Sequence, residues 1–279
     1  MVLARADESA ARVGIVGMRS IIRALLAAGI PLVFGPGAIH LPTVPAHRKW
    51  NRVDVGTADK VASAALGIVD QAERLGISYE DTSFVLLELG GAFSAALAVD
   101  AGQIVDGLGG SSGPIGARAC GGLDGEAAYL IGGALSKRTL FSGGALDPDG
   151  ALDLGAPGAL ERLRGDPRAR EGWLAYEEGA AKAVLALTAS VPAPREVLVA
   201  GRLASTPGLL GALAERLAGV APVRPALAVK NAARGAAVLA DGLAGGTHAP
   251  LVDRLRLREA RGGVLDHLRM YGAQGIALG

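Results

Sequence analysis

The clearest indication of the fold is FVLLELGGAFSAALAVDAGQIVDGLGG, residues 84–110. Its first apolar run ends at the glycine pair Gly90-Gly91, and Asp100-Ala101-Gly102 separates the second run from the third. Short apolar runs divided by residues that favour tight turns are typical of antiparallel strands joined by hairpins. We therefore predict a three-stranded meander over residues 84–89, 94–99 and 103–105.

The glycine pairs of this stretch allow two interpretations. Backbone without side chains lets a phosphate approach main-chain N–H groups, and it also suits a tight turn that binds nothing. The acid Glu88 stands just before Gly90-Gly91, at the end of a buried run, where an unpaired charge would be costly. It therefore either holds Mg²⁺ or its water shell, or pairs with a cation for structural reasons. The same choice applies to Gly109 and Gly110, which close the stretch.

Length and composition narrow the class of protein. With 279 residues, half of them hydrophobic, the chain can bury a substantial core. A net charge of +1 gives no electrostatic footprint for nucleic acid. No apolar run reaches the roughly 18 residues that span a bilayer, and the N-terminus lacks the pattern of a signal peptide. The single cysteine, Cys120, excludes an internal disulfide and is compatible with a reducing cytoplasm. Together, these features lead us to expect a cytoplasmic protein with no nucleic-acid or membrane partner.

The rest of the chain alternates predicted helices and strands. Apolar spacing and caps favour helices over residues 18–29, 57–75, 168–190, 206–219, 230–246 and 250–268. Short buried runs predict strands in IPLVFGPG, residues 30–37, and in REVLVAGRL, residues 195–203. Because the pattern changes from helix and loop to a meander near residue 80, we predict a domain boundary there, between residues 1–80 and 81–279.

A dense block of charged residues lies between Pro45 and Lys60, on a proline-rich loop that enters a predicted helix. Arginine and lysine on such a loop, together with the N-terminus of the helix, can bind an anion. Ordinary ion pairs on a solvated turn are the alternative. We predict anion contacts for Arg48, Lys49 and Arg52, and a magnesium or proton partner in Asp54 or Asp59.

Two further motifs contribute candidate residues. In GGLDGE, Asp124 could orient the acceptor or act as a base. It could equally be a helix N-cap, a common role for an aspartate that follows a loop. In VLVAGRLAS, Gly201 and Arg202 follow a predicted strand. Neither motif by itself decides between binding and local structure.

The order of these motifs resembles a known superfamily. A strand ending in a glycine pair, a hairpin, and a later strand ending VLVAGRLAS before a helix are similar to the acetate kinase, sugar kinase, heat-shock chaperone and actin superfamily. The resemblance implies an α/β, ribonuclease H-like, actin-like ATPase fold with the nucleotide in an interdomain cleft. The residues that it implies for ATP binding are Glu88, Gly90, Gly91, Gly109, Gly110, Gly201 and Arg202.

Four segments narrow the resemblance to a family of uncharacterised archaeal and bacterial proteins labelled predicted butyrate kinases. They are IHLPTVPAHRKWNRVDVGTADK, ELGGAFSAALAVDAGQIVDG, GGLDGEAAYL and KRTLFSGG, and the resemblance runs from about Ile30 to the C-terminus. The label implies ATP-dependent phosphoryl transfer to a short-chain carboxylate such as butyrate or acetate, with ATP and Mg²⁺ as cofactors, and a homodimer is compatible with it. The catalytic candidates are then Arg48, Lys49, Arg52, Asp54 and Asp124, and the metal candidates are Asp59 and Glu88.

Two departures from the superfamily pattern qualify this expectation. Ala200 stands where the adenosine-side turn usually has a second glycine. The Asp-x-Gly-Thr hairpin expected well upstream of AIHLPTVP has no counterpart in the residues that precede it, so either the coding start lies too far downstream or this is a shortened homologue. We therefore expect a complete second domain and an incomplete first one. The function is either that of a kinase or that of a catalytically inactive nucleotide- or metabolite-binding protein, and a structural module whose glycines only build turns is the third alternative.

Overall fold

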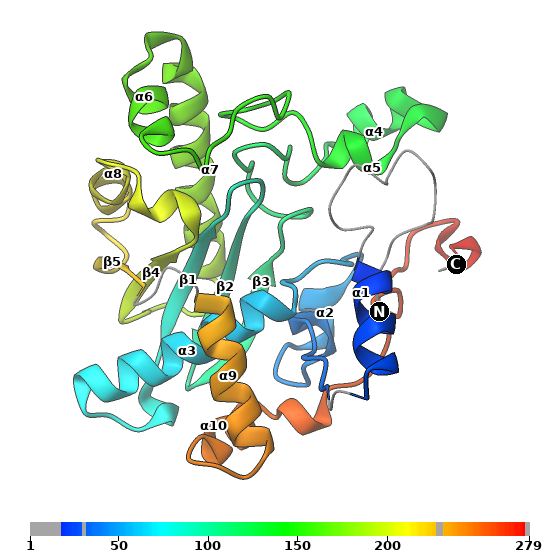
Figure 1. The fold of residues 1–279 in the computed structure, drawn as a ribbon, viewed down its shortest axis with the longest axis vertical. Coiled ribbons are helices and arrows are strands. Elements are labelled where there is room, and N and C mark those ends of the chain that lie inside the picture. The colour runs from blue at the N-terminus through cyan, green and yellow to red at the C-terminus, as the bar shows by residue number, and fades with distance from the viewer. Residues whose placement is uncertain (1–17, 30–31, 227–230, 277–279) are drawn as a thin grey trace.

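The meander forms three neighbouring strands of a five-stranded mixed sheet (Figure 1). The computed structural model describes residues 18–29, 32–226 and 231–276. Its strands are β1 Phe84–Leu89, β2 Ser94–Asp100, β3 Gln103–Leu108, β4 Glu196–Ala200 and β5 Val223–Pro225. They lie in the order β3-β2-β1-β4-β5, with β1 antiparallel to β2 and parallel to β4. The central strand β1 therefore joins the meander to the parallel part of the sheet.

The turn between β2 and β3 explains the short sequence Asp100-Ala101-Gly102. Asp100 pairs with Gln103, which leaves Ala101 and Gly102 as a two-residue loop. Both have positive φ, 48° and 66°, the combination that a type I′ turn requires. The predicted meander is confirmed, and β3 extends to Leu108, beyond its predicted end.

Helices cover both faces of the sheet (Figure 1). Their bounds are α1 Met18–Ala27, α2 Ala46–Lys49, α3 Ala58–Leu75, α4 Gly125–Ile131, α5 Lys137–Leu140, α6 Ala159–Gly165, α7 Arg170–Leu187, α8 Leu209–Arg216, α9 Asn231–Leu243 and α10 Ala249–Arg254. Side chains of α3, α9 and α10 pack on one face, and those of α7 and α8 pack on the other. Within the described ranges, no helix has the length and hydropathy of a membrane span.

Strand β1 contributes to both hydrophobic layers, because successive side chains of a strand point to opposite faces. Phe84 and Leu86 belong to the cluster with α3 and α9, whereas Val85 and Leu87 belong to the cluster with α7 and α8. Burial on both faces explains why FVLLEL is almost continuously apolar. Glu88 is the next residue on the face of Phe84 and Leu86, so it points toward α3.

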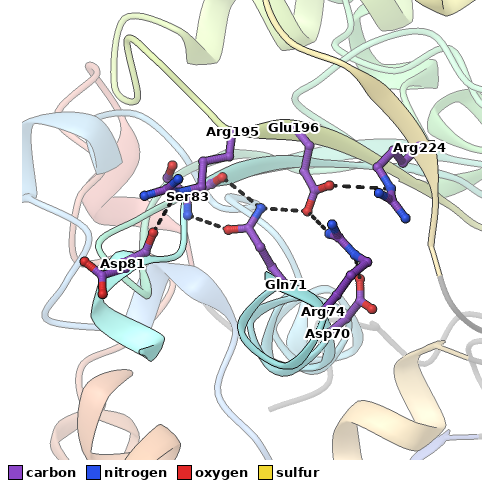
Figure 2. A network of polar contacts seen from close by, with 8 residues as sticks. All are labelled: Asp70, Gln71, Arg74, Asp81, Ser83, Arg195, Glu196 and Arg224. Carbon is purple, nitrogen blue, oxygen red and sulfur yellow. Dashed lines mark hydrogen bonds and ion pairs between the residues drawn. The ribbon is translucent and has the colours of Figure 1, made fainter. Parts of the chain in front are cut away.

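A buried carboxylate on β4 fixes the C-terminal half of α3 (Figure 2). Glu196 is 3% exposed and accepts hydrogen bonds from Gln71 Nε2 at 2.6 Å and from Arg74 Nη2 at 2.5 Å. Gln71 also bonds the backbone of Ser83, which precedes β1, through its carbonyl at 2.8 Å and its amide at 3.2 Å. Nε of Arg224 on β5 lies 3.6 Å from the second carboxylate oxygen. The network ties α3 to β4, to β5 and to the residue before β1, at the end of the sheet where β1 and β4 begin.

Two predicted elements are wrong in the described residues. Residues 32–37 form no strand, and Val33 and Phe34 are exposed by 76% and 57%; residues 30–31 lie outside the described ranges. The helix expected over residues 250–268 ends with α10 and is followed by a single 3₁₀ turn, Leu257–Glu259, and by loop. In the first case an apolar run has the pattern of a strand, but no other described element packs over it. In the second case an amphipathic pattern continues after the helix has ended.

The predicted boundary near residue 80 falls between α3 and β1. Ile39, Leu41 and Ile68 belong to the same hydrophobic cluster as Phe84 and Leu86. The boundary therefore does not coincide with a break in packing, and the division into residues 1–80 and 81–279 stays a prediction.

Candidate functional site

The parallel strands β1 and β4 end at the same edge of the sheet. Glu88 pairs with Ala200 in their register, so Gly90-Gly91 and Gly201-Arg202 leave the sheet next to each other. A methyl group built on Gly91 would lie 3.7 Å from Cδ and 3.8 Å from Nε of Arg202. In open α/β sheets, ligands bind outside the carboxyl ends of the strands. We name Glu88, Gly90, Gly91, Gly201 and Arg202 together the carboxyl edge.

Arg202 supplies a cation to the carboxyl edge. Its side chain is exposed and makes no hydrogen bond or ion pair within the part of the chain that the structure describes. It also approaches Gly155, where a methyl group would lie 2.7 Å from Nη1. The N–H of Gly91 likewise donates to no group in the described ranges. A guanidinium beside bare backbone is an arrangement that suits a phosphate.

Packing explains four of the five predicted glycines but does not explain Gly91. A methyl group would meet a neighbouring atom at 2.0 Å on Gly109, at 2.3 Å on Gly201 and at 2.8 Å on Gly90 and Gly110. Gly201 also has a φ of 93°, which side chains rarely adopt. Gly91 has no positive φ and no neighbour closer than 3.7 Å to such a methyl group. Turn geometry and packing therefore leave Gly91 available for a ligand.

Lys60 is a functional candidate that the sequence patterns did not single out. Its Nζ lies 3.0 Å from Oε1 of Glu88, and the two side chains are only 17% and 14% exposed. Lys60 lies in the first turn of α3, and α3 ends shortly before β1 begins. A helix that runs back along the following strand brings its first turn to the end of that strand. This connectivity is the signal that could have identified the pair.

Asp59 completes a small cluster of charges with Lys60 and Glu88. Its Oδ2 lies 2.7 Å from Nζ of Lys60, and its Oδ1 accepts a hydrogen bond from the hydroxyl of Thr57. Burial opposes the charge of Asp59, but the neighbouring Lys60 outweighs burial and holds the pKa of Asp59 below its usual value. Burial also opposes the charge of Lys60, and the two carboxylates outweigh it, so the pKa of Lys60 lies above its usual value. Lys60 is therefore an ammonium at neutral pH.

Glu88 offers a suitable ligand to the Mg²⁺ that the resemblance implies. Its Oε2 is buried and has no hydrogen-bond partner among the described residues. Mg²⁺ in nucleotide sites is held by one or two carboxylates and by the phosphates of the substrate. In the described ranges, no three acidic, histidine or cysteine side chains gather into a metal site. The residues present fit an ion that arrives together with a nucleotide.

The predicted anion contacts Arg48 and Arg52 each reach a neighbouring loop or strand. Arg48 Nη1 donates to the carbonyl oxygen of Val105 at 2.8 Å, and its Nε lies 3.8 Å from Oδ2 of Asp106. Arg52 Nη1 donates to the carbonyl oxygen of Ser112 at 3.1 Å. A guanidinium has five N–H donors, so both side chains keep further donors beyond these contacts. Their predicted role toward an anion stays a prediction.

Asp54 holds the loop after β3 in place. Its Oδ2 accepts hydrogen bonds from the N–H and the hydroxyl of Ser111, both at 3.2 Å, and its Oδ1 accepts from the N–H of Gly56 at 3.0 Å. The same carboxylate packs directly on Gly109. The structure thus gives Asp54 a role in loop geometry, and a magnesium or proton role stays a prediction.

Structural contacts within the protein explain two predicted catalytic residues, Lys49 and Asp124. Lys49 is 7% exposed, its ammonium donates to the carbonyl oxygen of Leu41 at 2.8 Å, and burial lowers its pKa. Asp124 caps α4 by accepting from the N–H groups of Glu126 and Ala127 at 2.9 Å and 3.0 Å. Figure 1 shows α4 at the periphery of the molecule. None of the described contacts of either residue involves the carboxyl edge, so their predicted catalytic roles have no support here.

A cavity of about 390 Å³ lies at the opposite end of the sheet. Its walls come from the residues before β1, from the β2–β3 turn and from the residues before β4, among them Asp81, Asp100 and Arg195. None of the predicted site residues lines it. The carboxyl edge therefore remains the place where the predicted residues of β1 and β4 meet.

Solved structures similar to this chain include two carboxylate kinases. An acetate kinase from Porphyromonas gingivalis matches with a TM-score of 0.53 and 16% identity, over 64% of this chain and 54% of the kinase. A propionate kinase from Francisella tularensis subsp. tularensis matches with a TM-score of 0.52 and 14% identity, over 79% of this chain and 67% of the kinase. This chain thus spans about half the length of the acetate kinase. The likeness shows the fold, which is the predicted actin-like ATPase fold.

No curated protein matches the chain in sequence. A family model, described as protein of unknown function (DUF1464), matches residues 1–270 and so includes all four segments on which the resemblance depends. This description carries no activity, and butyrate as a substrate stays a prediction. The chain belongs to the DUF1464 family and has an actin-like ATPase fold.

Proposed function

We propose that this chain binds a magnesium nucleotide at the carboxyl edge and transfers its terminal phosphoryl group to a short-chain carboxylate. The shared fold supports phosphoryl transfer, because an acetate kinase and a propionate kinase have it. The resemblance to proteins labelled butyrate kinases supports a carboxylate acceptor. Acetate, propionate and butyrate are accordingly the acceptors to test.

The proximity of Arg202 to the bare backbone of Gly91 carries the proposal. It combines bare backbone, with an N–H that donates to no described group, and a guanidinium without a partner in the described ranges. Phosphoryl transfer requires this kind of surroundings, in which donors and cations surround the phosphates and little covalent chemistry falls to the protein. A turn that served only to reverse the chain would need neither feature.

The residues of the carboxyl edge and the two arginines of the 45–60 loop have complementary roles in this proposal. Gly91 and Arg202 would hold phosphate oxygens, and Glu88 would hold Mg²⁺, which neutralises charge on the phosphates when bound. Arg48 and Arg52 would meet the negative charge of the acceptor. Gly201 allows β4 to turn close to Leu89, and it thereby brings Arg202 to Gly91.

Nucleotide or metabolite binding without catalysis is the second candidate function. The observation that favours it is the use of three predicted cations by the protein itself: Arg48, Lys49 and Arg52 each donate to a backbone carbonyl. A site with fewer free cations stabilises the transition state of phosphoryl transfer less. Binding at the carboxyl edge would be the same in both cases.

Phosphoryl transfer measured with three acceptors separates the two candidates. The protein is incubated with Mg-ATP and acetate, propionate or butyrate, and the acyl phosphate is trapped as a hydroxamate while ADP is quantified. Acyl phosphate above a control without protein supports the kinase. Nucleotide binding without acyl phosphate supports the second candidate. The absence of nucleotide binding by the folded protein contradicts the kinase and the nucleotide-binding form of the second candidate.

A further inference from the structure

Lys60 stands between two carboxylates that come from different elements. Its Nζ lies 3.0 Å from Oε1 of Glu88 on β1 and 2.7 Å from Oδ2 of Asp59 on α3. With only 17% of its side chain exposed, Lys60 is held at this position rather than extended into solvent. Two negative charges therefore share one ammonium.

The cluster retains capacity for a second cation. One positive and two negative charges leave a net negative charge, and Oε2 of Glu88 is buried without a hydrogen-bond partner in the described ranges. Glu88 lies at the end of a buried strand, where a carboxylate without a cation beside it would be costly. The ammonium of Lys60 is that cation, and it has three N–H donors on a flexible stem.

We propose that Lys60 is a positioning residue, a tethered cation in the place between Glu88 and Asp59 that a divalent metal ion would otherwise take. This place consequently holds no resident metal, and a metal ion binds at Glu88 only together with a nucleotide. This inference rests on the proposed function for its nucleotide, but not for the position of Lys60. At its other end, α3 is held to the sheet by Gln71 and Arg74, which donate to Glu196 (Figure 2).

Binding of Mn²⁺ without nucleotide tests the inference directly. Electron paramagnetic resonance or calorimetry gives the Mn²⁺ dissociation constant for the wild type, for Lys60→Met and for the matched control Lys182→Met. Lys182 also pairs with a glutamate, Glu178 at 2.6 Å, but it lies on α7 and is 73% exposed. We expect Lys60→Met to bind one Mn²⁺ at least tenfold more tightly than the wild type, Lys182→Met to match the wild type, and Lys60→Met with Glu88→Gln to lose the gain.

Two results would overturn the inference. One is tight Mn²⁺ binding by the wild type without nucleotide, and the other is a folded Lys60→Met protein that binds Mn²⁺ no better than the wild type. Circular dichroism reports folding, and Lys60→Gln replaces Lys60→Met if the latter does not fold, because its amide can still donate to the carboxylates. Since no nucleotide is present, these outcomes are independent of the proposed function, which fails separately if Mg-ATP does not bind.

Discussion

At the scale of single residues, the glycines of the carboxyl edge fall into two kinds, and alanine substitution distinguishes them. In Gly201→Ala, the new methyl group would meet the carbonyl oxygen of Leu89 at 2.3 Å, and φ is 93°. We expect the free energy of unfolding to fall by about 3 kcal/mol. In Gly91→Ala we expect no fall and a gain of up to about 1 kcal/mol, because the site has room and alanine restricts the unfolded chain. Urea denaturation measures both, and equal losses at the two positions would contradict the assignment of Gly91 as the residue free for a ligand.

Lys49 predicts a dependence of stability on pH. Burial lowers the pKa of its ammonium below the usual value of 10.5. Between the lowered pKa and 10.5 the unfolded chain therefore binds more protons than the folded one, so the contribution of Lys49 to the free energy of unfolding rises with pH.

Lys49→Met lacks this contribution and serves as the reference. We expect the difference in free energy of unfolding, wild type minus Lys49→Met, to increase as the pH is raised from 7 toward 10.5. Urea denaturation at a series of pH values gives the difference. A difference that falls over this range would mean that the pKa of Lys49 is raised, as expected for a lysine that binds an anion or a carboxylate.

At the scale of elements, α3 connects the two ends of the sheet, and Glu196 is its anchor. Glu196→Gln removes the negative charge that faces Arg74, whose side chain is 24% exposed. We expect the free energy of unfolding to fall by about 2 kcal/mol, less than for a fully buried pair because water screens the arginine in part. Glu178→Gln on α7, at an exposed pair of glutamate and lysine, is the matched control and should have no measurable effect. Similar losses in both variants would show that the network around Glu196 does not hold α3.

Helix α4 offers a test of the role of Asp124. Serine caps a helix as well as aspartate does, whereas alanine does not, and loss of a cap costs about 1 kcal/mol. We expect Asp124→Ala to speed hydrogen exchange of the amides at the start of α4 about fivefold, and Asp124→Ser to leave it unchanged. If Asp124 acts only as a cap, both variants retain any phosphoryl transfer of the wild type. A loss of transfer in Asp124→Ser with normal exchange would restore Asp124 as a catalytic residue.

The sequence predicts well those elements whose signals are local. The meander predicted over residues 84–105 is confirmed, because its turns carry glycine and its strands β1 and β2 bury apolar side chains on both faces. The strand expected in IPLVFGPG is wrong because an apolar run between proline and glycine has the same pattern whether another element covers it or not. Val33 and Phe34 are exposed.

The candidate site is predictable only where chain order implies proximity. Gly91 and Arg202 could be placed together because both follow parallel strands, which the resemblance to a known fold supplied. Gly109 and Gly110 are explained by close neighbours, and Lys49 is buried. Both features result from tertiary packing, which the local sequence pattern does not indicate. Lys60 lies between these cases, since the antiparallel path from α3 into β1 implies its contact with Glu88.

At the scale of the whole molecule, the two ends of the sheet differ in kind. The end where β1 and β4 begin carries the network around Glu196, which ties α3 to the strands (Figure 2), and beside it the cavity lined by Asp81, Asp100 and Arg195. The end where they finish carries an exposed arginine, bare backbone and a carboxylate with an unpartnered oxygen in the described ranges. An end held by a hydrogen-bond network, opposite an end with unsatisfied polar groups, is the arrangement expected of a scaffold that presents a binding site.

Calorimetry with Mg-ATP measures whether a nucleotide binds at the ends of β1 and β4. The wild type is compared with Gly91→Val and with the control Gly219→Val, a glycine with open space around it and no part in the carboxyl edge. We predict that the wild type and Gly219→Val bind Mg-ATP with the same dissociation constant, and that Gly91→Val stays folded but binds at least tenfold more weakly. No binding by the folded wild type, or equal binding by Gly91→Val, would contradict a nucleotide site at the ends of β1 and β4.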